Sequence, residues 1–130
     1  MTQEEKALLL KDLCSRLPYK LRVKYYYCLE ETTGFADEGF LAYDYLKSFG
    51  TERTISVWGG KRVYNIVPYL RPMSSMTEDE KREHYRLKGH SDWQAQDYLD
   101  YIHVDYRGLI WKGLALEAPE GMYENEIKSI

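Results

Sequence analysis

The sequence predicts an α+β protein with an N-terminal helix, a small antiparallel sheet of three or four strands, two C-terminal helices and an irregular closing segment. Two observations carry this prediction. Apolar residues repeat with a helical period near both ends of the chain and with a period of two in between. Strands grouped together, with helices before and after them, indicate an α+β class. Such a sheet can form an SH3-like or partly open barrel.

The length of 130 residues predicts a single domain over 1–130. Within it, we assign 1–18 to the first helix, 19–68 to the sheet and 69–130 to the helical and closing segment. The hydrophobic content of 44% and the charged content of 30% are typical of a globular chain with its own core. Tyrosine is unusually frequent, with 13 residues, and this residue suits half-buried sheets and interfaces.

Residues 2–18 give the clearest helical pattern. Thr2 and Glu5 make a T-x-x-E capping box. Pro18 ends the helix because it has no N–H and restricts the residue before it. We expect one apolar stripe to face the core, with the spacing i, i+3, i+4, i+7: Leu10, Leu13, Cys14 and Leu17. Leu9 widens this stripe.

Residues 20–29 alternate with a period of two and predict a half-buried strand. One face carries Leu21, Val23, Tyr25, Tyr27 and Leu29. The other face carries Lys20, Arg22, Lys24, Tyr26 and Cys28. A turn or loop follows at 30–34.

Three later segments complete the predicted sheet. Residues 39–49 favour a strand with alternating Leu41, Tyr43, Tyr45 and Phe49, although Phe40, Tyr43 and Leu46 would also make a helical stripe. Residues 54–67 indicate a hairpin whose tight turn is Gly59-Gly60. The prolines of 68–72 predict an extended connector that breaks regular structure.

Two helices and a closing segment follow. Thr77 and Glu80 form a second capping box for a helix that ends at Gly89. Ser91 caps the next helix, whose apolar stripe is Ala95, Tyr98, Leu99 and Ile102. In the closing segment Asp105 can cap a short turn of helix that Gly113 ends. The large residues there have no strict period, so we expect a strap that lies across a core: Leu109, Ile110, Trp111, Leu114 and Leu116.

The net charge and the positions of the cysteines limit the classes of protein to which this chain can belong. The net charge of −3 argues against a general nucleic-acid coat. Residues 1–72 carry +2 and residues 73–130 carry −5, so the halves can attract each other within a fold or between copies of a homo-oligomer. Cys14 and Cys28 lie in patterned apolar segments, which fits reduced, buried thiols in a cytoplasmic protein. The start of the chain is unlike a signal peptide, and no apolar run is long enough for a membrane helix.

No motif in the sequence indicates an enzyme, and we predict no catalytic residue, metal or cofactor. His90-Ser-Asp92 and His103-Val-Asp105 are H-x-D pairs at the two ends of one predicted helix, too far apart to share a metal. A metal-dependent hydrolase built on them remains the third hypothesis. The Gly-Gly-Lys at 59–61 lacks the spacing of a phosphate loop.

A stripe of cations and aromatic residues is the candidate binding surface. Lys20, Arg22 and Lys24 alternate along about 13 Å of one strand. We expect the same surface to include Tyr26, Trp58, Lys61 and Arg62. Cations interleaved with rings can bind a nucleotide or single-stranded nucleic acid by phosphate contact and stacking. The alternative is a solvated face whose charges pair with acids of the second half.

Three stretches carry a resemblance: "MTQEEKALLLKDLCSRLPY", "PYLRPMSSMTEDE" and "DYRGLIWKGLALEAPEGMY". They are similar to a group of small uncharacterised proteins of Bacteroides-type gut bacteria, their phages and other mobile elements. The resemblance does not cover about 20–67, and it transfers no catalytic residue. It implies a constant frame that holds a variable sheet. We therefore expect a non-enzymatic accessory protein that binds a host protein or a small ligand such as a nucleotide, in a counter-defence role. Single-stranded nucleic-acid binding is the second hypothesis.

Overall fold

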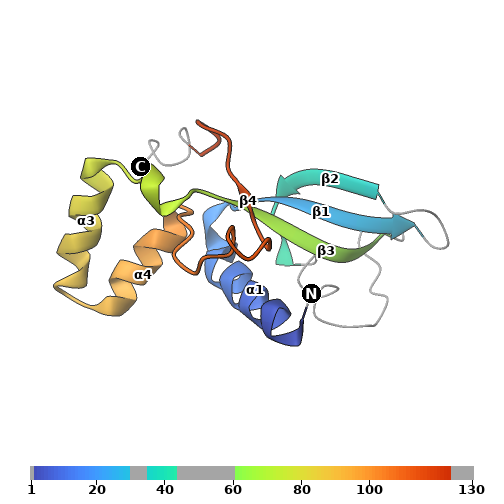
Figure 1. The fold of residues 1–130 in the computed structure, drawn as a ribbon, viewed down its shortest axis with the longest axis horizontal. Helices are drawn as coiled ribbons and strands as arrows, with labels where there is room; N and C mark the ends of the chain where they lie inside the picture. Colours follow the sequence, from blue (N-terminus) through green and yellow to red (C-terminus); the bar gives the residue numbers. More distant parts are fainter. Residues whose placement is uncertain (1, 30–34, 44–60, 124–130) are drawn as a thin grey trace. The chain divides into compact units, whose positions relative to one another are not determined.

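The computed structural model describes residues 2–29, 35–43 and 61–123, and the chain divides into two compact units, Met1–Tyr69 and Leu70–Ile130. Figure 1 shows the helices and the grouped strands that confirm the predicted α+β class. The described elements are α1 (Gln3–Arg16), β1 (Arg22–Leu29), β2 (Phe35–Phe40), β3 (Lys61–Leu70), α3 (Glu78–Lys88), α4 (Asp92–Tyr101) and β4 (Leu116–Glu117).

Helix α1 begins at the predicted capping box. The Thr2 hydroxyl accepts from the Glu5 N–H at 3.0 Å, and the Glu5 carboxylate accepts from the Thr2 N–H at 2.9 Å. Leu9 and Leu13 of the predicted stripe are buried, but Cys14 is exposed, so the buried face differs in part from the prediction. The residues that are buried keep the i, i+3, i+4, i+7 spacing but start one position earlier: Leu9, Asp12, Leu13 and Arg16.

The shifted face of α1 contains an ion pair. Arg16 donates from Nε to the Asp12 carboxylate at 3.0 Å, and both side chains are 0% exposed. A charged pair one turn apart can lie inside a core only when the two groups neutralise each other. The apolar pattern therefore identifies Leu9 and Leu13 but misses the charged pair that shares their face. After α1 a 3₁₀ turn, Leu17–Tyr19, carries the proline that was predicted to end the helix.

Strand β1 lies between β2 and β3 and pairs with both in antiparallel register. Its predicted alternation is confirmed at Leu21, Val23 and Tyr25, which are buried. Arg22 and Lys24 lie on the opposite, half-buried face. A register shift between Tyr26 and Tyr27 interrupts the pairing with β3.

Strand β2 corrects the prediction for 39–49. The strand runs over Phe35–Phe40, so it starts earlier than expected and ends where the expected strand was to begin. Leu41 is buried, and Tyr43 is already helical, so neither continues the strand. Residues 44–49 lie outside the described part of the chain. Pairing with β1 over six residue pairs determines β2, whose sequence FADEGF has little strand propensity.

Strand β3 corrects the predicted connector. It continues through Pro68 and Tyr69 to Leu70, and Pro68 pairs in register with Val23. A proline is tolerated in a strand where the ladder does not need its missing N–H. The first strand of the predicted hairpin and Gly59-Gly60 lie outside the described residues. The sheet order is β2-β1-β3-β4, and Ala118, just after β4, donates to the Leu70 carbonyl at 2.8 Å.

In the second unit, α3 and α4 lie side by side (Figure 1). The predicted capping box of α3 is present in both directions, and Ser91 caps α4 by accepting from the Gln94 N–H at 3.1 Å. The apolar stripe of α4 is buried as expected at Ala95, Leu99 and Ile102. A core cluster in this unit contains Met76, Leu99, Ile102 and Val104, against which Tyr98, Tyr101 and Tyr106 pack.

Only part of the closing segment packs against the core as predicted. Asp105 caps a turn as predicted, because its two carboxylate oxygens accept from the N–H groups of Leu109 and Ile110, both at 2.9 Å. Leu109 and Leu114 are buried. Trp111, however, is 95% exposed, so the expectation that it lies across a core is wrong. Leu116, predicted in the same set, is 39% exposed.

Candidate functional site

The structure brings part of the predicted binding surface together on one face of the sheet in the first unit. Arg22, Lys24 and Tyr26 alternate along β1 on its half-buried face. Lys20 precedes the strand in a left-handed conformation with φ of 51°, so it does not belong to the ladder.

The other predicted residues add no described side chain to this face. Trp58 lies outside the described residues. Lys61 and Arg62 open β3, but their side chains are outside the described part of the chain.

Each of the two strand cations lies over an aromatic ring. The Arg22 guanidinium is 4.9 Å from the centre of the Phe40 ring, and the Lys24 ammonium is 5.7 Å from the centre of the Tyr26 ring. Phe40 is 46% exposed, on β2 directly opposite Arg22. Attraction between a cation and a ring face holds the long side chains along the sheet. We call Arg22, Lys24, Tyr26 and Phe40 the cation–ring face.

A hydrogen bond from β3 to β2 borders the cation–ring face. The Tyr69 hydroxyl donates to the Glu38 carboxylate. This bond raises the pKa of Tyr69 to about 12, and burial and the negative charge of Glu38 act in the same direction, while the positive charge of Arg22 opposes them. Tyr69 is therefore a neutral hydrogen-bond donor at physiological pH. Sequence reasoning missed both residues because it placed neither on a strand.

The charge of this face is mixed. Glu38 is exposed and stands directly opposite Lys24 in the β1–β2 register, whereas Asp37 pairs with Tyr25 and so points to the other face of the sheet. Two cations beside one acid bind a compact anion better than a long polyanion, whose further phosphates the acid would repel. The face offers positive charge and aromatic surface.

The H-x-D residues have local structural roles. Asp92 lies in the first turn of α4, and the Asp105 carboxylate caps the turn described above. The His103 ring is buried and stacks on Tyr123, with ring centres 4.0 Å apart. Over the described ranges, no group of three or more His, Cys, Asp or Glu side chains is arranged to hold a metal ion.

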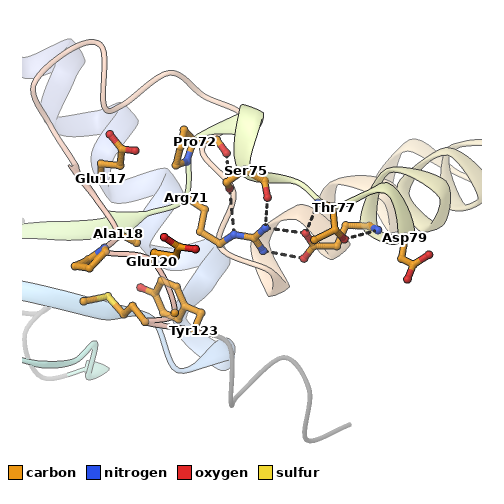
Figure 2. Close-up of a pocket in the computed structure, with 13 residues that line it drawn as sticks. Arg71, Pro72, Ser75, Thr77, Asp79, Glu117, Ala118, Glu120 and Tyr123 are labelled. Atoms are coloured by element: carbon orange, nitrogen blue, oxygen red, sulfur yellow. Dashed lines mark hydrogen bonds and ion pairs between the residues drawn. The ribbon is translucent and has the colours of Figure 1, made fainter.

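The second unit contains a cavity of about 670 Å³. Figure 2 shows Arg71 in this cavity, with its guanidinium pointing toward Ser75 and the Thr77 end of α3, and with Glu117, Glu120 and Tyr123 contributed by the closing segment. Residues of 71–80 and of 117–123 thus line it together. The other lining residues are Pro72, Asp79, Glu80, Ala118, Pro119, Gly121 and Met122.

Arg71 uses all five of its side-chain N–H donors inside the protein. Two bonds of 2.7 and 2.8 Å go to the two oxygens of Glu80. The other three go to the Ser75 hydroxyl, the Ser75 carbonyl and the Ile102 carbonyl. Such a saturated guanidinium is a structural clamp, because an anion could bind it only by displacing these partners.

Glu80 takes part both in the ion pair with Arg71, which we call the Arg71 clamp, and in the capping box of α3. One of its oxygens accepts from the Thr77 N–H at 2.9 Å as well as from Arg71. Burial raises the pKa of Glu80, but the hydrogen bonds from Arg71 and Thr77 and the Arg71 charge outweigh it and hold the pKa below its ordinary value. The clamp therefore ties the segment after β3 to the start of α3.

Comparison with protein-family models, curated proteins and solved structures finds no significant match. None of the described helices combines the length and the apolar character needed to cross a membrane.

Proposed function

We propose that this protein is a non-enzymatic binding protein whose cation–ring face holds a nucleotide. The observation that carries the proposal is the placement of Arg22 and Lys24 over exposed or half-exposed rings on one side of β1. Two cations about two residues apart suit a phosphate group, and a neighbouring ring suits a base. The neutral Tyr69 hydroxyl adds a polar group at the border of the face.

A small nucleotide fits this face better than a nucleic-acid strand. Glu38 on β2, directly opposite Lys24, would repel the successive phosphates of a strand that ran across this face. A mononucleotide or a short cyclic dinucleotide presents only one or two phosphates. This supports sequestration of a nucleotide signal as the specific role, in keeping with the mobile-element resemblance of the sequence and with a cytoplasmic location.

Titration of the full chain with a panel of nucleotides at physiological salt tests the proposal. Replacing Arg22 and Lys24 by glutamine should weaken nucleotide binding by about tenfold or more, because two charge-assisted contacts are lost. The matched control replaces Lys11 and Lys88, two exposed lysines on α1 and α3, and changes the net charge equally. The control should bind like the wild type.

Two results would contradict the proposal. One is no binding to any nucleotide in the panel, and the other is an equal loss of binding in the control. Binding only to single-stranded oligonucleotides, with an affinity that falls steeply with salt, would favour the alternative function. Capture of a host protein through this face, without nucleotide binding, would favour the broader role as an effector-blocking protein.

A further inference from the structure

The turn at 109–113 displays Trp111 on a firmly held backbone. Leu114 donates to the Leu109 carbonyl at 2.9 Å, and Gly113 donates to the Ile110 carbonyl at 3.1 Å. Gly113 has a φ of 73°, a conformation that suits glycine. The Asp105 cap closes the other side of the turn, while Leu109 and Leu114 anchor it in the core.

Trp111 is exposed in a way that suits an interface. Its side chain is 95% exposed at the tip of the turn, so it does not occupy the cavity of its own chain. An indole ring carries a large apolar area with little rotational freedom to lose, and tryptophan is enriched among residues that dominate binding energy. A turn that is already ordered lowers the entropic cost of binding further. Lys112, the next residue, is exposed as well.

The cavity in the second unit complements Trp111 and Lys112 in its apolar wall and in its charge. Its wall includes apolar surface from Pro72, Ala118, Pro119 and Met122. Glu117 and Glu120 are exposed carboxylates among its lining residues, and the charge of Arg71 is already balanced by Glu80. Its volume of about 670 Å³ lies within the range of roughly 300–1,000 Å³ typical of pockets that hold small molecules. An indole ring is smaller than such ligands.

We propose that Trp111 of one copy docks in this cavity of a second copy, with Lys112 facing Glu117 and Glu120. The charge of the two surfaces is opposite, and both belong to the same chain. The contact is heterologous, because a knob on one copy meets a hole on the next. In a pair, one copy still has a free Trp111 and the other still has a free cavity. Association can therefore continue as a chain of copies or close as a ring.

Sedimentation velocity of the full chain over a range of concentrations tests this contact. Wild type should self-associate, and Trp111→Ala should weaken association by about tenfold or more. Trp93→Ala is the matched control, because Trp93 is also a highly exposed tryptophan, 72% exposed on α4. The control should associate like the wild type. Replacing Glu117 and Glu120 by lysine should weaken association by repulsion of Lys112.

Mixing the two defective variants tests the knob-and-hole geometry directly. W111A keeps an intact cavity, and E117K/E120K keeps an intact Trp111. At a concentration where the wild type associates and each variant alone stays monomeric, the mixture should form dimers that do not grow further. A monomeric wild type, an equal loss of association in W93A, or a mixture that stays monomeric would each overturn the proposal. A change in nucleotide binding is not needed for it, so the test is independent of the proposed function.

Discussion

The Arg71 clamp gives a quantitative test of the structure, because one side chain holds five hydrogen bonds. Replacing Arg71 by methionine keeps most of the alkyl chain and removes every donor. Breaking a buried ion pair costs about 3–5 kcal/mol. The Arg71 and Glu80 side chains are 15% and 11% exposed, so water replaces part of what is lost. We therefore expect R71M to lower the free energy of unfolding by about 3 kcal/mol.

Urea unfolding followed by far-ultraviolet circular dichroism measures this loss at neutral pH. Arg71→Lys separates charge from geometry, since lysine keeps the positive charge but has three donors and no planar fork. We expect R71K to lose about half as much as R71M, roughly 1.5 kcal/mol. Changes within about 0.5 kcal/mol of the wild type, which are typical of an ordinary surface substitution, would refute the reasoning for either variant.

The pH dependence of Glu80→Gln tests the same clamp from its acidic side. The folded-state pKa of Glu80 lies below the ordinary value of 4.5, so its carboxylate stabilises the fold fully above that pH. This contribution is lost as the pH falls through the folded-state pKa. The difference in unfolding free energy between wild type and E80Q should therefore be largest at neutral pH and shrink in acid. A difference that is constant or grows in acid would refute the assigned pKa direction.

Three further substitutions test other parts of the chain. Asp12→Ala leaves Arg16 charged and fully buried in α1, so urea unfolding should show a loss of about 3 kcal/mol or more, while replacing both residues by apolar ones should restore most of it. Asp105→Ala removes both acceptors of its turn and should cost about 1–2 kcal/mol, with Asp105→Asn intermediate. Tyr69→Phe should remove one phenol that ionises near pH 12 in an ultraviolet titration. Because the pKa of Tyr69 is raised, the stability advantage of wild type over Y69F should be constant below pH 10 and decline as the pH rises toward 12.

Local signals explain why the helix starts could be predicted. A capping box needs only two residues three positions apart, and both T-x-x-E boxes form as the sequence indicates. The buried face of α1 could not be predicted in the same way. Asp12 and Arg16 enter the core as a neutralising pair, and hydrophobic periodicity counts each of them as a surface residue.

The sheet shows where distant pairing overrides local preference. Phe35–Phe40 contains two acids and a glycine, and only its alignment with β1 makes it a strand. Pro68 leads to the opposite error. The sequence predicts that this proline breaks regular structure, yet β3 continues through it. Tyr69 and Glu38 meet through these two strands, so the polar border of the cation–ring face could not be predicted from the sequence.

The residues that stabilise the fold and those of the proposed binding surfaces differ in how their polar groups are used. Arg71 and Asp105 have their donors or acceptors satisfied within the fold, which makes them parts of a frame. Arg22 and Lys24 are held over rings on a half-buried face, and Trp111 is held out to solvent by that frame. Nucleotide binding and self-association therefore depend on different side chains. W111A should bind nucleotide as tightly as the wild type at concentrations where both are monomeric, and a weaker affinity there would mean that Trp111 itself contributes to the nucleotide site.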